Sequence, residues 1–214
     1  LMLVLASFVP AHSSAQDSGL TLPEQADVRI IVDISGSMKE TDPNNLRQPA
    51  VRLLARVLPE GSTAGVWTFG QYVNMLVPHG EVSESWRETA IAESGKINSV
   101  ALRTNLGKAI EVASVDFVTG GSLENTHFIL LTDGKQTIEA DGPHGNTIES
   151  ANSNITETCE AMKADGIEVF VIAFAVADAP TQTMLRNCAS DEPFYYQPEV
   201  TDQLDLIFEG IFDT

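Results

Sequence analysis

Five side chains of this sequence end in a hard oxygen donor and follow, or directly precede, a regular element. They are Asp33, Ser35, Ser37, Thr104 and Asp133. Hard cations such as Mg²⁺ take oxygen ligands and retain several waters, whereas zinc favours nitrogen and sulfur. Two carboxylates and three hydroxyls therefore predict a site for magnesium, with manganese or calcium as alternatives.

The elements that must position these donors alternate between apolar runs and segments of helical periodicity. Strands are predicted at residues 28–33, 65–69, 72–77, 126–131, 167–174 and 194–197. Helices are predicted at residues 45–58, 85–97, 105–118 (with Thr104 as the N-cap), 148–164, 180–189 and 201–212. Continuous apolar strands between helices indicate a mostly parallel sheet covered on both faces. The fold class is therefore doubly wound α/β, with a hairpin at residues 65–77 that adds one antiparallel edge strand.

The carboxyl ends of the strands are where open α/β sheets bind ligands. Asp33 lies at the end of the first strand, in the motif DISGS, and Asp133 follows the fourth strand in the motif TDG. Gly36 is expected to let the DISGS loop turn tightly, so that the two serine hydroxyls face one point. The loops at residues 80–83 and 137–147 are expected to border the crevice and to set specificity.

Each donor also has an ordinary structural explanation. Thr104 is a good N-cap by itself, serines and Asp-Gly pairs are common in turns, and Lys135 is close enough in sequence to pair with Asp133. The joint occurrence is harder to explain in this way, because a buried carboxylate without a partner is costly and no Lys or Arg lies near Asp33 in sequence. Trp86 and the pair Tyr195–Tyr196 are further candidates for a binding face.

The DISGS motif, followed by Thr104 and then Asp133, resembles the metal-ion-dependent adhesion site of von Willebrand factor A domains, over residues 26–212. The resemblance implies that the serine and threonine hydroxyls coordinate a divalent metal, and that the aspartates bind it directly or through water. An acidic side chain of a protein partner would complete the octahedron. It therefore implies a metal-dependent protein-binding module rather than an enzyme. A structural scaffold within an envelope complex is the alternative.

The region around the second cysteine resembles the A domains of bacterial envelope proteins, including those of adhesive pili. The resemblance rests on LRNCAS at residues 185–190 and on the aromatic residues at 194–196. It implies that Cys188 pairs with Cys159 on the preceding helix. These are the only two cysteines, and an even pair in an exported chain indicates a disulfide by itself.

The first residues have the pattern of an export signal. Residues 1–9 are almost wholly apolar and residues 10–16 are small and polar, so residues 1–15 are expected to form part of a signal peptide, cleaved after Ala15. Residues 16–25 have the composition of a linker, and residues 26–214 are expected to form one domain. No later run reaches the length of a membrane span, although an anchor beyond Thr214 stays open. We expect an exported protein of the bacterial periplasm or cell surface.

The charge balance limits the partners. The chain has 30 Asp and Glu against 12 Lys and Arg, a formal net charge of -18, which disfavours nucleic acid and anionic lipid. The acidic surface is also at odds with an acidic protein ligand, except at the metal itself. Among enzymes, a magnesium-dependent hydrolase or phosphotransferase is the remaining alternative. Asp33 would be its sole candidate nucleophile, because the sequence contains no Walker loop, HExxH or GxSxG motif.

Overall fold

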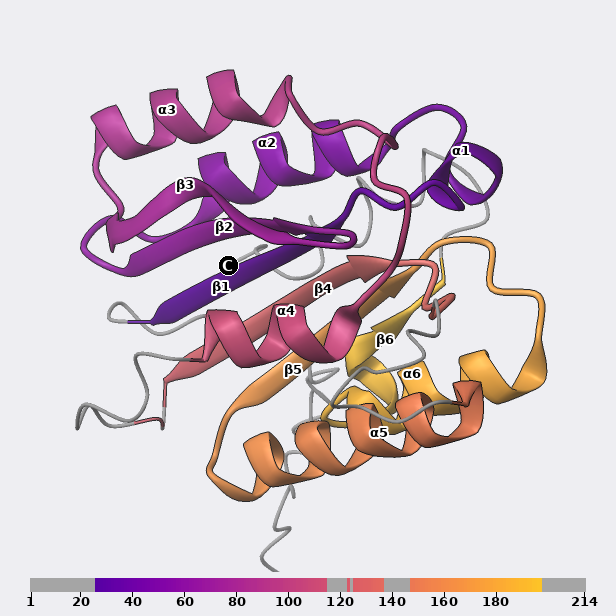
Figure 1. Cartoon of the computed structure of the whole chain (residues 1–214). Coiled ribbons are helices and arrows are strands. Elements are labelled where there is room, and N and C mark those ends of the chain that lie inside the picture. The colour runs from indigo at the N-terminus through magenta and orange to yellow at the C-terminus, as the bar shows by residue number, and fades with distance from the viewer. Residues whose placement is uncertain (1–25, 115–122, 124, 137–146, 198–214) are drawn as a thin grey trace, which may run out of the picture.

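A six-stranded sheet forms the centre of the molecule. The computed structural model describes residues 26–114, 123, 125–136 and 147–197. The strand order is β3-β2-β1-β4-β5-β6, and only the β2–β3 pair is antiparallel (Figure 1). The strands are β1 Asp27–Asp33, β2 Thr63–Phe69, β3 Val73–Glu81, β4 Thr126–Thr132, β5 Glu168–Ala173 and β6 Tyr195–Tyr196. The predicted fold class, with its one antiparallel edge strand, is confirmed.

Helices cover both faces of this sheet. The helices are α1 Met38–Thr41, α2 Arg47–Val57, α3 Glu84–Ser94, α4 Leu106–Ala113, α5 Ile148–Ala164 and α6 Ala179–Cys188, with a short 3-10 helix at Glu192–Phe194. Helices α2 and α3 pack on one face, and α4, α5 and α6 pack on the other. The result is the three-layer arrangement expected of a doubly wound sheet.

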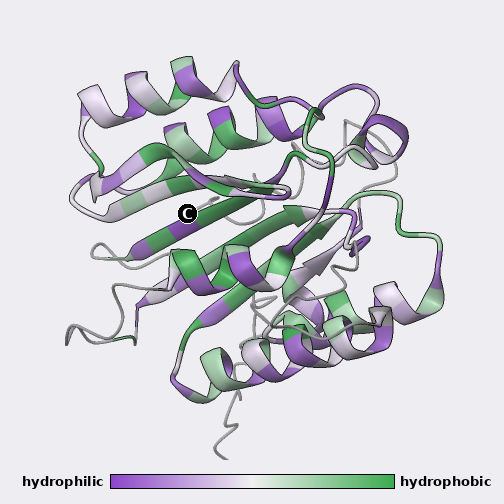
Figure 2. Cartoon of the chain, in the orientation of Figure 1, coloured by the Kyte–Doolittle hydropathy of each residue, from purple (hydrophilic) through white to green (hydrophobic). Residues whose placement is uncertain are grey.

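The central strands are apolar on both faces because both faces are covered. In β1, Val28, Ile30 and Val32 point toward α2 and α3, and Ile31 points toward α4 and α5. Figure 2 shows hydrophobic colouring along most of β1, β4 and β5, with hydrophilic colour at the beginning of these strands and within β1. This burial explains why these strands lack the polar alternation of a half-exposed sheet.

Several expected features differ in the structure. Asn105 rather than Thr104 is the N-cap of α4, since its side chain accepts a hydrogen bond from Lys108 N at 3.0 Å. Trp86 and Tyr195 are buried in the two cores, so they do not line a binding face.

The loop after β3 is also misplaced by the sequence prediction. Glu81 pairs with Thr63, the first residue of β2, so the loop at 80–83 lies at the amino ends of the parallel strands, away from the predicted crevice.

Other predictions fall outside the described residues. These are the signal segment at 1–15, the linker at 16–25, most of the loop at 137–147 and the closing helix at 201–212. No helix among the described residues is long and apolar enough to cross a membrane.

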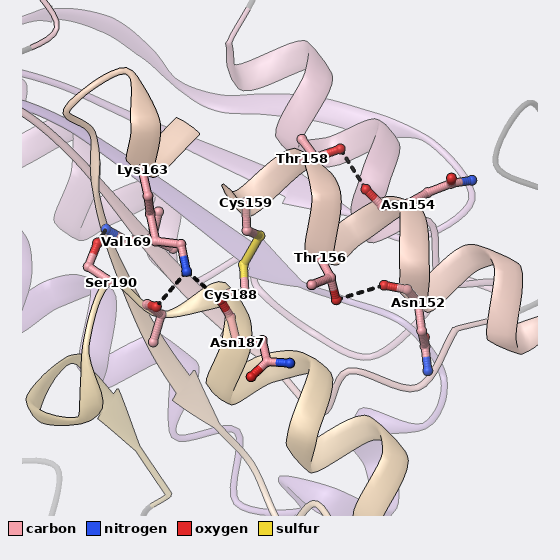
Figure 3. The surroundings of a disulfide bond; sticks show 11 residues. Asn152, Asn154, Thr156, Thr158, Cys159, Lys163, Val169, Asn187, Cys188 and Ser190 are labelled. Carbon is pink, nitrogen blue, oxygen red and sulfur yellow. Dashed lines mark hydrogen bonds between the residues drawn. A yellow bond between two sulfur atoms is a disulfide. The ribbon is translucent and has the colours of Figure 1, made fainter. Parts of the chain in front are cut away.

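The predicted disulfide between Cys159 and Cys188 is present and joins α5 to the last residue of α6 (Figure 3). Beside it, Lys163 Nζ donates hydrogen bonds to the carbonyl oxygens of Asn187 and Ala189. A cation at the carboxyl end of a helix compensates the helix dipole. The disulfide and the lysine therefore fasten the two helices that support β5.

Candidate metal centre

Three segments that are distant in sequence meet at the carboxyl edge of the sheet. Strands β1 and β4 are parallel neighbours, with Val32 opposite Leu131, so Asp33 and Asp133 leave the sheet at the same edge. The third segment is the connection from α3 to α4, which carries Thr104 and passes this edge in Figure 1. The topology thus brings together the segments of all five predicted donors.

The DISGS loop is folded around the carboxylate of Asp33. Its Oδ1 accepts a hydrogen bond from Ser35 N at 2.8 Å, and the Oγ atoms of Ser35 and Ser37 lie 3.0 Å apart. Gly36 lies in the turn between the two serines, whose hydroxyls face one another as predicted, but the turn does not need a positive φ at this glycine. A Cβ there would lie 3.4 Å from Ala101 O, which is close to an ordinary van der Waals contact, so the neighbouring loop does not by itself require glycine at this position.

Thr104 is positioned by contacts of its loop with β1 and with the β2–β3 hairpin. Ala101 N donates to Ile34 O at 3.0 Å, and Asn105 N donates to Gly70 O at 3.1 Å. Gly70 is required at this contact, because an added Cβ would lie 2.1 Å from the Cβ of Ala101. Backbone contacts on both sides therefore hold the buried Thr104 at the edge of the sheet.

Two threonines that the sequence analysis did not identify orient the carboxylates. Thr132 Oγ1 donates to Asp33 Oδ2 at 2.6 Å, and Thr41 Oγ1 donates to Asp133 Oδ2 at 3.0 Å. Lys135 meets Asp133 through its backbone N, which donates to Oδ1 at 3.0 Å. The ion pair between Lys135 and Asp133, which the sequence left open as an alternative, is not among the ion pairs of the described part.

The two carboxylates are buried without a protein cation. Asp33 and Asp133 are both 0% exposed, and none of the ion pairs among the described residues includes either of them. Burial, together with the charge of Asp133, raises the pKa of Asp33 to about 6. Two adjacent buried carboxylates are costly unless a cation compensates them. The all-oxygen donor set fits a hard divalent cation.

Arg47, also missed from the sequence, joins the loops around the site. This fully buried guanidinium donates to the backbone carbonyl of Asp33, to Asp42 Oδ2 at 2.7 Å, to Asn45 Oδ1 at 2.9 Å and to Ser99 Oγ at 2.8 Å. Asp42 neutralises the charge of Arg47, so this arginine is not a counter-ion for the two site carboxylates. Its hydrogen bonds instead hold the surrounding loops in position. It connects the end of β1 to the loop that carries Thr104.

Comparison with known proteins identifies the family of this chain. A curated relative, a UPF0353 protein of Mycolicibacterium vanbaalenii, is 31% identical over 158 residues, which are 68% of this chain and 46% of that protein. The chain thus spans about half the length of that relative.

Two solved structures share the fold. The pilus adhesin SpaC of Lactobacillus rhamnosus GG has a TM-score of 0.69 at 12% identity, over 91% of this chain and 31% of the adhesin. Proximal thread matrix protein 1 of the mussel byssus, solved with a zinc-occupied metal-ion-dependent adhesion site, has a TM-score of 0.63 at 19% identity, over 88% of this chain and 47% of that protein. The family model for the von Willebrand factor type A domain matches residues 27–210. The chain therefore belongs to the von Willebrand factor type A domain family.

Proposed function

We propose that this domain binds a protein partner through a divalent cation. The cation would be held by Asp33, Ser35, Ser37, Thr104 and Asp133, and would bridge to a carboxylate of the partner. The observation that carries the proposal is the pair of buried carboxylates, Asp33 and Asp133, that lack a cationic partner among the described residues.

The chain's own residues would divide the work. The serine and threonine hydroxyls supply neutral oxygen ligands, and the aspartates supply the negative charge. Thr132 and Thr41 hold the two carboxylates by hydrogen bonds, as outer ligands of metal sites commonly do. The bound cation would supply a positive point charge at an otherwise acidic surface. Magnesium suits the donor set best, with manganese and calcium as alternatives.

A binding role is favoured over catalysis. Asp33, the one candidate nucleophile, is fully buried and already accepts hydrogen bonds from Ser35 N and Thr132 Oγ1. The two histidines within the described residues, His79 and His127, lie at the amino ends of the parallel strands, remote from the site. A hydrolase would need a general base beside the metal. Domains of this family are generally adhesion or scaffold modules.

We also propose that the protein is exported and acts in the periplasm or on the cell surface of a bacterium. The apolar segment at residues 1–9, the disulfide and the fold shared with a pilus adhesin support this proposal. Disulfides persist in oxidising compartments. Within this proposal, residues 1–15 are a signal segment and residues 16–25 a linker.

Calorimetric titration of the purified chain with magnesium, manganese, calcium and zinc tests the metal site. One ion should bind per chain, and a Ser35→Ala/Ser37→Ala variant should lose binding. A Ser83→Ala/Ser85→Ala variant is the matched control, because it removes another serine pair whose Oγ atoms lie 3.1 Å apart; it also removes the N-cap of α3, so it should lose some stability but keep metal binding. Absence of both binding heat and a thermal shift in the wild type would refute the metal site and favour a scaffold.

A further inference from the structure

Large apolar side chains are exposed beside the proposed metal centre. Among the described residues, four large hydrophobic side chains are exposed, and three of them lie in two adjacent loops at the carboxyl edge of the sheet. These three, which we name the apolar rim, are Tyr72 (72% exposed), Val100 (65%) and Leu102 (89%). The fourth, Met75, lies further along β3, opposite Trp67. The clustering is notable because single exposed hydrophobics are normal, whereas grouped ones mark interaction sites.

The loops that carry the apolar rim are held in place. Gly70, at the tip of the β2–β3 hairpin, accepts a hydrogen bond from Asn105 N and packs directly against Ala101. In Figure 1 the connection from α3 to α4 passes this hairpin tip. Ala101 also bonds to the backbone after β1, so the rim side chains on either side of it point outward. The same contacts that position Thr104 therefore keep Val100 and Leu102 in solvent.

Basic residues border the same surface. Lys39 lies two residues after Ser37, Arg103 directly before Thr104, and Lys135 two residues after Asp133; all three are exposed. Each of the three loops that carry a proposed donor therefore also carries one basic residue. This is noteworthy because the whole chain has only 12 Lys and Arg. Acidic groups are present as well, since Glu40 follows Lys39 and Asp178 lies near Lys135. The basic residues ease the approach of a carboxylate to a strongly acidic domain.

We propose that the apolar rim determines which acidic partner binds. The partner is a protein segment whose metal-binding Asp or Glu is flanked by large apolar side chains, and these pack on Tyr72, Val100 and Leu102. This inference rests on the proposed metal-dependent function and deepens it. Leu102 is only two residues from Thr104, so a carboxylate at the metal places its neighbouring side chains over the rim. Burying apolar surface there makes such a segment bind about tenfold more tightly than a polar one.

Two capped peptides test the proposal, Gly-Leu-Asp-Phe-Gly and Gly-Ser-Asp-Ser-Gly. Each is titrated by NMR into the full chain after magnesium binding has been measured. We expect the apolar peptide to bind about tenfold more tightly, and both peptides to be released by EDTA. In a Tyr72→Ser/Leu102→Ser variant the preference should fall to about one while binding of the serine peptide is retained. A Met75→Ser variant, which removes the exposed hydrophobic outside the rim, should keep the preference.

The outcomes separate the two proposals. Equal affinity for the two peptides in the wild type, a preference that survives in the double variant, or no binding of either peptide to the magnesium-loaded chain would overturn the role of the rim. Absence of magnesium binding would instead refute the metal-dependent function, and the rim proposal with it.

Discussion

One aspartate at each end of β1 shows a different response to its surroundings: Asp27 is partly buried, and Asp33 is fully buried. At the amino ends of the strands, Asp27 accepts hydrogen bonds from His79 Nε2 at 2.6 Å and from Arg29 Nη2 at 2.9 Å. Burial alone would raise the pKa of Asp27, but the bonds from His79 and Arg29 outweigh it and lower the pKa. At the carboxyl ends, burial and the charge of Asp133 raise the pKa of Asp33 to about 6.

This comparison supports the proposed metal site at the carboxyl ends. The carboxylate of Asp27 is compensated within the chain, as is normal for a structural charge. Within the part of the chain that the structure describes, hydroxyl and amide groups donate the hydrogen bonds to Asp33 and Asp133, and no cationic side chain pairs with either carboxylate. Strong perturbation of a buried acid without a protein cation is characteristic of functional sites. Four predictions test whether the two ends differ in this way.

The largest effect is expected from the two buried arginines. Arg47→Met removes the cation from buried Asp42 and should destabilise the domain by about 3 to 5 kcal/mol. It should also weaken magnesium binding, because Arg47 bonds to Ser99 and to the carbonyl of Asp33. Arg29→Met at the amino end should cost less stability, because Asp27 is 24% exposed and keeps its contact with His79, and it should leave magnesium affinity unchanged. Urea unfolding and calorimetry measure both quantities; equal loss of magnesium affinity in the two variants would contradict the comparison.

The second prediction exchanges one carboxylate at each end. Asp133→Asn should reduce magnesium affinity more than about 100-fold, since it removes a proposed ligand. In EDTA near neutral pH the same variant should melt at a higher temperature than the wild type, because it relieves the repulsion with Asp33. Asp27→Asn should melt at a lower temperature and bind magnesium normally. A lower melting temperature for both variants in EDTA would show that the carboxyl end is compensated within the chain.

The third prediction concerns two glycines. Gly70→Ala would place a Cβ 2.1 Å from that of Ala101 and displace the loop that carries Thr104. Magnesium affinity should fall about tenfold, as for other changes to the support of a metal ligand. Gly80→Ala is the control, because no heavy atom lies within 4 Å of the Cβ it would add. Unchanged affinity in Gly70→Ala would indicate that Thr104 does not contribute to the site.

The fourth prediction concerns the pH dependence of the metal-free domain. The pKa of Asp33 is raised from 3.8 to about 6 in the folded state, so its contribution to stability is present below the unfolded pKa and is lost as pH rises through about 6. The pKa of Asp27 is lowered, so its contribution is present at high pH and is lost as pH falls through the folded value.

Unfolding in EDTA between about pH 4 and about pH 8 should separate the two contributions. Asp33→Asn should remove the loss at rising pH, and Asp27→Asn should remove the loss at falling pH. Magnesium affinity should decrease below about pH 6, where Asp33 becomes protonated. Identical pH profiles for the two variants would refute the contrast.

Local pattern was sufficient to predict the layers and the location of the donors. Buried parallel strands are apolar along their whole length, so 27–33, 126–132 and 168–173 could be recognised from composition, and helix α5 was predicted with its exact bounds. Side chains that follow parallel strands lie at one edge of the sheet. The sequence alone therefore predicted that Asp33 and Asp133 lie at the same edge. The two cysteines left a single possible pairing.

Only the tertiary structure decided how those donors are supported. Thr132 bonds to Asp33 across 99 residues and Thr41 to Asp133 across 92, and contacts at such separations leave no periodic signal in a sequence. In the sequence, Arg47 is an ordinary basic residue in the first turn of a helix. Only the structure shows that it donates hydrogen bonds to four residues around the site. The contact between the β2–β3 hairpin tip and the loop before α4 could not be predicted from the sequence. This contact is the reason for glycine at position 70, and it brings the residues of the apolar rim to neighbouring loops. Residue type therefore determined which oxygen donors are available, whereas long-range packing decided which buried carboxylates lack a cationic partner among the described residues.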